Sequence, residues 1–73
     1  MSYVITYKPL WELLRQKNIK RSELREILGF SPNTIAKMSK NQFVSLQVIE
    51  KICREFDCDV SDVISFDRRS KDE

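Results

Sequence analysis

The chain has 73 residues, a net charge of +2, 41% hydrophobic residues, two cysteines and no histidine. This length allows one domain with a small core, which needs efficient packing or dimerisation for stability. No apolar run approaches the roughly 20 residues of a membrane span, and the N-terminus lacks the basic and apolar segments of a signal peptide. We therefore expect one cytoplasmic domain.

Charge is distributed unevenly along the chain. Residues 1–40 contain eight Lys or Arg against three Asp or Glu, whereas residues 41–73 contain five against eight. A basic half favours a polyanionic partner, although an ordinary solvated surface would have the same composition.

The composition argues against an enzyme. Without histidine the commonest general base is absent, and a serine or cysteine nucleophile lacks its usual partner. Cys53 and Cys58 are one pair with no His, which makes a zinc site improbable, and a disulfide does not suit a cytosolic protein. We expect both cysteines to be buried as small apolar residues, and we expect no metal and no cofactor.

Both ends of the chain contain candidate strands. The segment S-Y-V-I-T-Y at Ser2–Tyr7 is rich in β-branched and aromatic residues, which is typical of a strand. Its partner could be Val63–Phe66 at the other end of the chain. It could also be the same strand of a second subunit, which would produce a dimer. Residues 67–73 are entirely polar and are expected to be a mobile tail, leaving residues 1–66 as the domain.

Five short helices are expected between these ends. Apolar residues spaced by three and four predict helices over 9–18, 21–28, 32–39 and 46–56, and Asp59 with Asp62 resembles a capping box for a short fifth helix. The fold class is therefore all-α, with a possible small terminal β element. Residues expected to face the core include Leu13, Leu24, Ile27, Leu28, Phe30, Ile35, Met38, Phe43, Val44, Leu46, Ile49, Ile52, Phe56, Val60, Val63 and Ile64.

The segment 20–40 has the plan of a helix-turn-helix motif. Gly29 is the only glycine in the chain and follows the second predicted helix, where a turn with positive φ favours glycine. Ser31 can cap the next helix, and Pro32 suits its first turn. In such motifs the second helix enters the DNA major groove.

Helical geometry turns the polar residues of this second helix outward. Asn33 can bond the adenine edge, Lys37 can donate to guanine, and carbon atoms of Thr34 or Pro32 can contact a thymine methyl. The alternative is that Asn33 and Thr34 only stabilise the first helical turn and that Lys37 is merely solvated. The helix N-terminus also favours nearby phosphates. We expect phosphate contacts from Arg21, Ser31, Lys40 and Asn41.

The sequence resembles the small Cro/CI-type (XRE family) helix-turn-helix regulators, within them the bacterial YozG-like subgroup, and it is similar to the VanU-type regulators of vancomycin-resistance operons. The resemblance rests on Y-K-P-L-W at 7–11, S-P-N-T-I-A-K-M-S-K-N at 31–41, V-S at 44–45 and I-C-R-E-F-D-C-D-V-S-D-V at 52–63. It implies a compact five-helix phage-repressor-like domain with the third helix in the major groove. It also implies base contacts from Pro32, Asn33 and Lys37.

Three positions depart from the family pattern. Arg25 occupies a position where a small alanine usually faces the turn, so its side chain must reach outward or shift the helix crossing. Arg21 stands where glutamine is common, and Pro32 replaces a hydrogen-bonding residue. Base readout is therefore expected to depend mainly on Asn33 and Lys37.

Two functions are open at this point. The first is a sequence-specific DNA-binding regulator that binds a palindromic operator as a homodimer. The second is a protein-binding module on the same fold, such as an antitoxin or the partner of another regulator. The module would use aromatic residues, chiefly Tyr3, Tyr7, Trp11 and Phe43. Binding that resists high salt would favour the module, and steep loss with salt would favour DNA.

Overall fold

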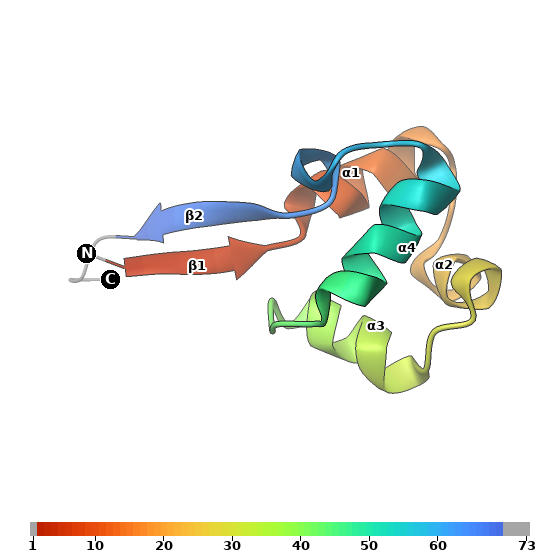
Figure 1. Cartoon of the computed structure of the whole chain (residues 1–73), viewed down its shortest axis with the longest axis horizontal. Helices are drawn as coiled ribbons and strands as arrows, with labels where there is room; N and C mark the ends of the chain where they lie inside the picture. Colours follow the sequence, from red (N-terminus) through yellow and green to blue (C-terminus); the bar gives the residue numbers. More distant parts are fainter. Residues whose placement is uncertain (1, 70–73) are drawn as a thin grey trace.

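The computed structural model describes residues 2–69 and consists of a helical body with a small sheet projecting from it (Figure 1). Four helices and a one-turn 3-10 helix lie between two strands. In chain order these are β1 (Ser2–Thr6), α1 (Lys8–Gln16), α2 (Arg21–Leu28), α3 (Pro32–Ser39), α4 (Leu46–Phe56), η1 (Val60–Asp62) and β2 (Ser65–Arg69).

The two ends of the chain pair with each other. β1 and β2 form an antiparallel two-stranded sheet in which Ile5 lies opposite Phe66 and Tyr3 opposite Arg68. The predicted internal pairing is thus confirmed, with different limits. The second strand starts later than Val63 and runs through residues 67–69, which were expected in the tail, because pairing with β1 supplies the backbone hydrogen bonds that polar residues would otherwise take from water. Residues 70–73 lie outside the described part.

The limits of α2, α3 and α4 match those predicted from the sequence. α1 begins at Lys8, whose backbone N–H donates to Thr6 Oγ1 over 3.2 Å, and it ends before Asn18, which has a φ of 58°. The predicted fifth helix is wrong, since the capped segment makes only the three-residue turn η1. The Asp59 N–H donates to Asp62 Oδ2 as expected, but the chain enters β2 too soon for a longer helix.

The core lies where the helices meet. It is formed by buried residues from β1's end, all four helices and the segment after η1, and Ile19 packs beside it. These buried residues are Tyr7, Leu10, Leu14, Leu24, Met38, Ile49, Ile52 and Val63.

Four residues expected in the core are instead exposed. Ile27 lies at the margin of the short apolar stripe of α2, centred on Leu24 and Leu28, and is 47% exposed. Phe43 in a loop and Leu46 at a helix start are 75% and 77% exposed, and Val60 at the start of η1 is 49% exposed.

A buried tyrosine connects the sheet to the far side of the body. The Tyr7 hydroxyl donates to the Gln42 carbonyl oxygen over 2.6 Å, across 35 residues of sequence. Burial raises the pKa of this phenol above its ordinary value of 10.0. Tyr7 thereby fixes the α3–α4 connection beside the end of β1. Among residues 2–69, no helix is both long and apolar enough to cross a membrane.

Candidate nucleic-acid interface

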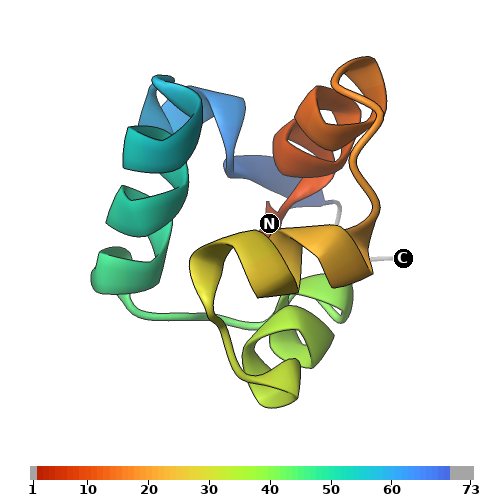
Figure 2. The same cartoon turned by 90° about the vertical axis from the view of Figure 1, so that its right-hand side faces the viewer.

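The motif is built by local capping on both sides of one glycine. The Lys20 N–H donates to Glu23 Oε1 over 2.8 Å at the start of α2. Gly29 ends that helix with a φ of 69°, the left-handed conformation expected for it. Ser31 then caps α3, accepting from the Thr34 N–H over 3.3 Å, with Pro32 in the first turn. In Figure 2, α2 runs across the view above α3, with α4 upright on the left and α1 above the right-hand end of α2.

α3 has one face in the core and one in solvent. Met38 is fully buried, and Ile35 packs against the core. Pro32, Asn33 and Lys37 are exposed, as their positions on the helix predicted. The exposed set therefore presents an amide and an ammonium group on a helix whose opposite face is fixed.

The hydroxyls of Ser31 and Thr34 are already engaged with each other. Ser31 Oγ lies 3.2 Å from Thr34 Oγ1 in addition to capping the helix, and Thr34 is half-buried. This arrangement agrees with the structural interpretation of Thr34, in which it stabilises the first turn. The thymine contact of Thr34 and the phosphate contact of Ser31 stay predictions.

The guanidinium group of Arg21 joins three helices. Its Nη1 donates to Ser39 Oγ over 2.9 Å, and its central carbon lies 3.7 Å from the centre of the Trp11 ring. Arg21 is exposed, and a guanidinium has five N–H donors, so donors are left for a phosphate. No sequence pattern connects residues 10 and 18 positions apart, so these contacts were not predicted.

The remaining phosphate candidates lie at the C-terminal end of α3. Lys40 and Asn41 are exposed, and Asn41 has a φ of 58° while its N–H donates to the Met38 carbonyl oxygen. The bond from Arg21 to Ser39 brings that side chain to this same end. Ser31 lies at the other end, about 12 Å away by helical rise. The structure thus separates the phosphate candidates into two groups.

Arg25, unassigned from the sequence, is half-buried in α2. Its carbonyl oxygen accepts from the N–H groups of Gly29 and Phe30. Among residues 2–69 its side chain makes no ion pair within 4.0 Å of a carboxylate.

A helix, a left-handed glycine turn and a capped helix with a polar outer face define a helix-turn-helix DNA-binding domain. The chain belongs to the Cro/C1-type helix-turn-helix DNA-binding domains, whose family model matches residues 9–68. It is similar to a solved structure titled "Crystal structure of transcriptional regulator VanUg, Form II". That likeness has 39% sequence identity and a TM-score of 0.88, and covers 94% of this chain and 92% of the other. A search of curated proteins found no match. The family is one of DNA-binding regulators and not of enzymes.

Proposed function

We propose that this protein is a sequence-specific transcriptional regulator that inserts α3 into the major groove of an operator. The observation that carries the proposal is the two-sided character of α3. Asn33 and Lys37 are exposed, while Met38 on the opposite face is fully buried. A helix fixed in this way presents its polar residues to base edges without a further cost of ordering its backbone on binding.

The groups beside α3 supply the electrostatic part of binding. Arg21 and Lys40 hold positive charge near the C-terminal end of the helix, where Ser39 orients the Arg21 guanidinium. Phosphate contacts of this kind set the register and orientation of a protein on DNA, and base contacts add the specificity. Pro32, Thr34, Ser31 and Asn41 complete the proposed contact surface.

A palindromic operator and a homodimer follow from the small size of α3. A helix of eight residues reads only a few base pairs, so adequate specificity requires two copies about 34 Å apart along the duplex. Such a regulator works in the cytoplasm, where bacterial DNA lies.

Selection of bound duplexes from a random library, followed by anisotropy titrations, tests this function. We expect an enriched site with two-fold symmetry, bound at least 1,000-fold more tightly than random DNA at physiological salt. We also expect affinity to fall steeply between 50 and 200 mM salt. Recovery of no enriched sequence, with weak binding that is insensitive to salt, would contradict the proposal.

The protein-binding alternative gains support from only some of its aromatic residues. Tyr3 and Phe43 are exposed, but Tyr7 is buried and Trp11 packs against the core beneath Arg21. A partner captured equally well at low and high salt, together with absent DNA affinity, would favour this function over the first.

A further inference from the structure

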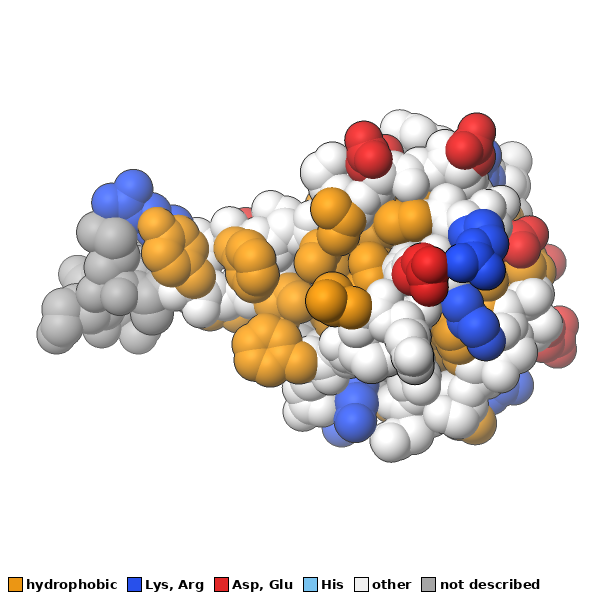
Figure 3. Space-filling view, in the orientation of Figure 1, with side chains coloured by type: hydrophobic (Ala, Val, Ile, Leu, Met, Phe, Trp, Pro, Cys, Tyr) orange, Lys and Arg blue, Asp and Glu red, His pale blue; other side chains and the backbone are white. Residues whose placement is uncertain are grey.

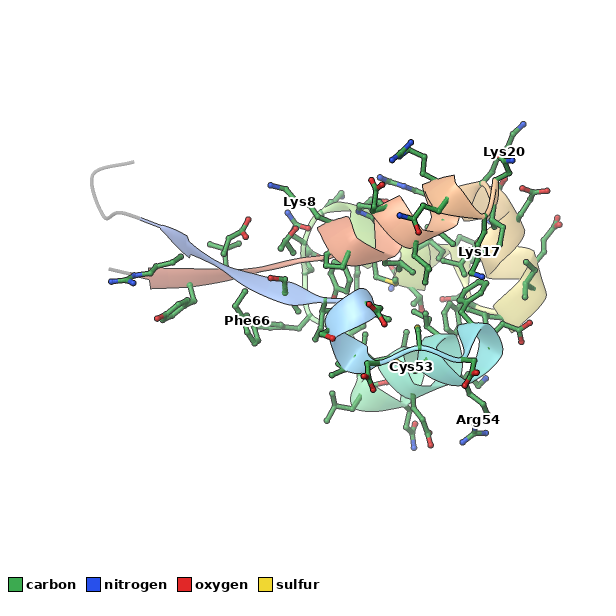
Figure 4. The ribbon with its side chains drawn as sticks, turned by 90° about the horizontal axis from the view of Figure 1, so that it is seen from above. Lys8, Lys17, Lys20, Cys53, Arg54 and Phe66 are labelled. Carbon is green, nitrogen blue, oxygen red and sulfur yellow. The ribbon has the colours of Figure 1, made fainter. Side chains whose placement is uncertain are left out.

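An apolar face extends across the sheet and onto the helical body. In the antiparallel register, Tyr3 and Ile5 of β1 share a face with Phe66 of β2, and Arg68 lies at the outer end of this face, opposite Tyr3. Tyr3 is 66% and Phe66 61% exposed. In Figure 4 the Phe66 side chain projects on the side of the molecule where α4 lies.

The same face continues through the α3–α4 connection. The hydrogen bond from Tyr7 to Gln42 holds this connection beside the end of β1. Phe43 and Leu46 come shortly after Gln42 in the chain. They are 75% and 77% exposed. Figure 3 shows hydrophobic side chains gathered in one band from the sheet to the body. We call the four residues Tyr3, Phe43, Leu46 and Phe66 the apolar face.

The opposite side of the sheet differs in character. It carries Val4, which is half-buried, Thr6, which is buried, and Asp67, which lies 3.7 Å from the Lys8 ammonium. Leu46 also continues the apolar stripe of α4, in which Ile49 is nearly fully buried. The stripe therefore extends beyond what residues 2–69 of one chain cover. A two-stranded sheet is marginally stable without packing on one face.

We propose that the apolar face is the surface on which a second copy of this chain docks. Large aromatic side chains cover about 150–250 Å² each, so the four residues leave on the order of 500 Å² of apolar surface open. That lies within the range of about 300–600 Å² for the largest apolar patch on a monomer, which is often a functional surface. With a polar rim it approaches the roughly 800 Å² per partner of a stable interface. A second copy supplies the same surface in a two-fold arrangement.

The shape of the chain suits this occupant. The long axis of the described part is 39 Å against 22 and 21 Å for the others, because the sheet projects from the body (Figure 1). In a two-fold pair, the sheet of each copy covers Phe43 and Leu46 of the other. Asn33 and Lys37 on α3 are not part of the apolar face, so this interface does not use the residues proposed to read bases. The inference rests on the proposed function only for the use of the dimer at an operator.

Sedimentation velocity of the full chain over a concentration series tests the interface. We expect the wild type to sediment at twice the chain mass of 8.7 kDa. Phe66→Ser and Leu46→Ser each should weaken association by roughly 30-fold or more, as loss of a central anchor does. The matched control is Ile27→Ser, which removes an exposed aliphatic residue from α2 and should leave the dimer intact. Circular dichroism verifies that each variant folds.

Three results would overturn the assignment. These are a wild type that is monomeric at every concentration, a dimer unchanged in the folded variants, and equal loss in Ile27→Ser. Binding to a single half-site at low salt separates this inference from the proposed function. A monomeric wild type that still prefers that half-site over random DNA leaves the function standing and removes the interface. A wild type that forms the dimer but has no DNA affinity supports the interface and removes the proposed function.

Discussion

The guanidinium of Arg21 stacks on the ring of Trp11, with 3.7 Å from its central carbon to the ring centre. The same group donates to Ser39 Oγ. One side chain at the start of α2 thus contacts α1 beneath it and the last turn of α3 beside it. This makes Arg21 a positioning residue for α3 as well as a candidate phosphate ligand.

The two roles of Arg21 predict different results for two variants. Arg21→Ala should lower the free energy of unfolding by about 1–2 kcal/mol through the lost stacking and hydrogen bond. It should also reduce the slope of log affinity against log salt by about 0.9. Arg21→Lys should keep the salt slope. It should lose most of the stability that the Arg21 contacts contribute, because an ammonium lacks the planar fork of the guanidinium. Urea denaturation measures the free energy of unfolding, and anisotropy titrations at several salt concentrations measure the slope. Ser39→Ala, which removes only the hydrogen bond, is the control, and a salt slope unchanged in Arg21→Ala would exclude the phosphate contact.

Asn33→Ala and Lys37→Ala should reduce preference for the selected operator over random DNA by about 1–3 kcal/mol each. Both side chains are exposed, so urea midpoints should change little. Arg54→Ala is a matched control for Lys37→Ala, because it removes one positive charge from an exposed ion pair with Glu50 on α4. An unchanged ratio of operator to random binding in Asn33→Ala would show that this amide does not read a base.

Gly29→Ala should destabilise the protein by about 1 kcal/mol. The cost comes from the backbone alone, since a Cβ at this position would meet no atom within 4 Å and φ is 69°. Gly29→Asn should cost less, because asparagine tolerates the left-handed conformation better than alanine. Urea denaturation of the three proteins gives the comparison. Equal stability of the alanine variant and the wild type would mean that the turn adjusts without strain.

The stability of the protein should fall between pH 9 and 11. Burial, with smaller effects from Cys53, Asp62 and Asp59, raises the pKa of the Cys58 thiol from 9.0 to about 11. In that interval the unfolded chain has lost the proton and the folded chain still holds it, so rising pH favours unfolding. Below pH 9 the thiol holds its proton in both the folded and the unfolded chain, so Cys58 makes its full contribution to stability there.

Thermal midpoints of the wild type and of Cys58→Ala, measured at pH 8 and pH 10, test this dependence. The wild type should lose more stability over the interval than the variant. Tyr7→Phe serves as a second reference, because the raised pKa of the Tyr7 phenol acts in the same direction above pH 10. An identical pH dependence in Cys58→Ala and the wild type would exclude a role for the thiol.

The sequence determined the helical elements and the outer face of α3. Three helices have the limits predicted, because capping residues and the period of the apolar positions are local properties. Ser31, Gly29 and Pro32 act through neighbours one to four residues away, so their roles could be derived from the chain order. The exposure of Asn33 and Lys37 follows from the same helical period.

Only the tertiary structure decided which apolar residues lack cover and which partners Arg21 has. The contacts of Arg21 with Trp11 and Ser39 span 10 and 18 residues, and no periodicity encodes them. Phe43 and Leu46 have core-like sequence patterns but are exposed, because burial depends on what the rest of the chain places over a residue. The pairing of β1 with β2 was likewise a tertiary feature. Where the sequence predicted a short fifth helix and a polar tail from residue 67, the structure has the single turn η1 and the strand β2.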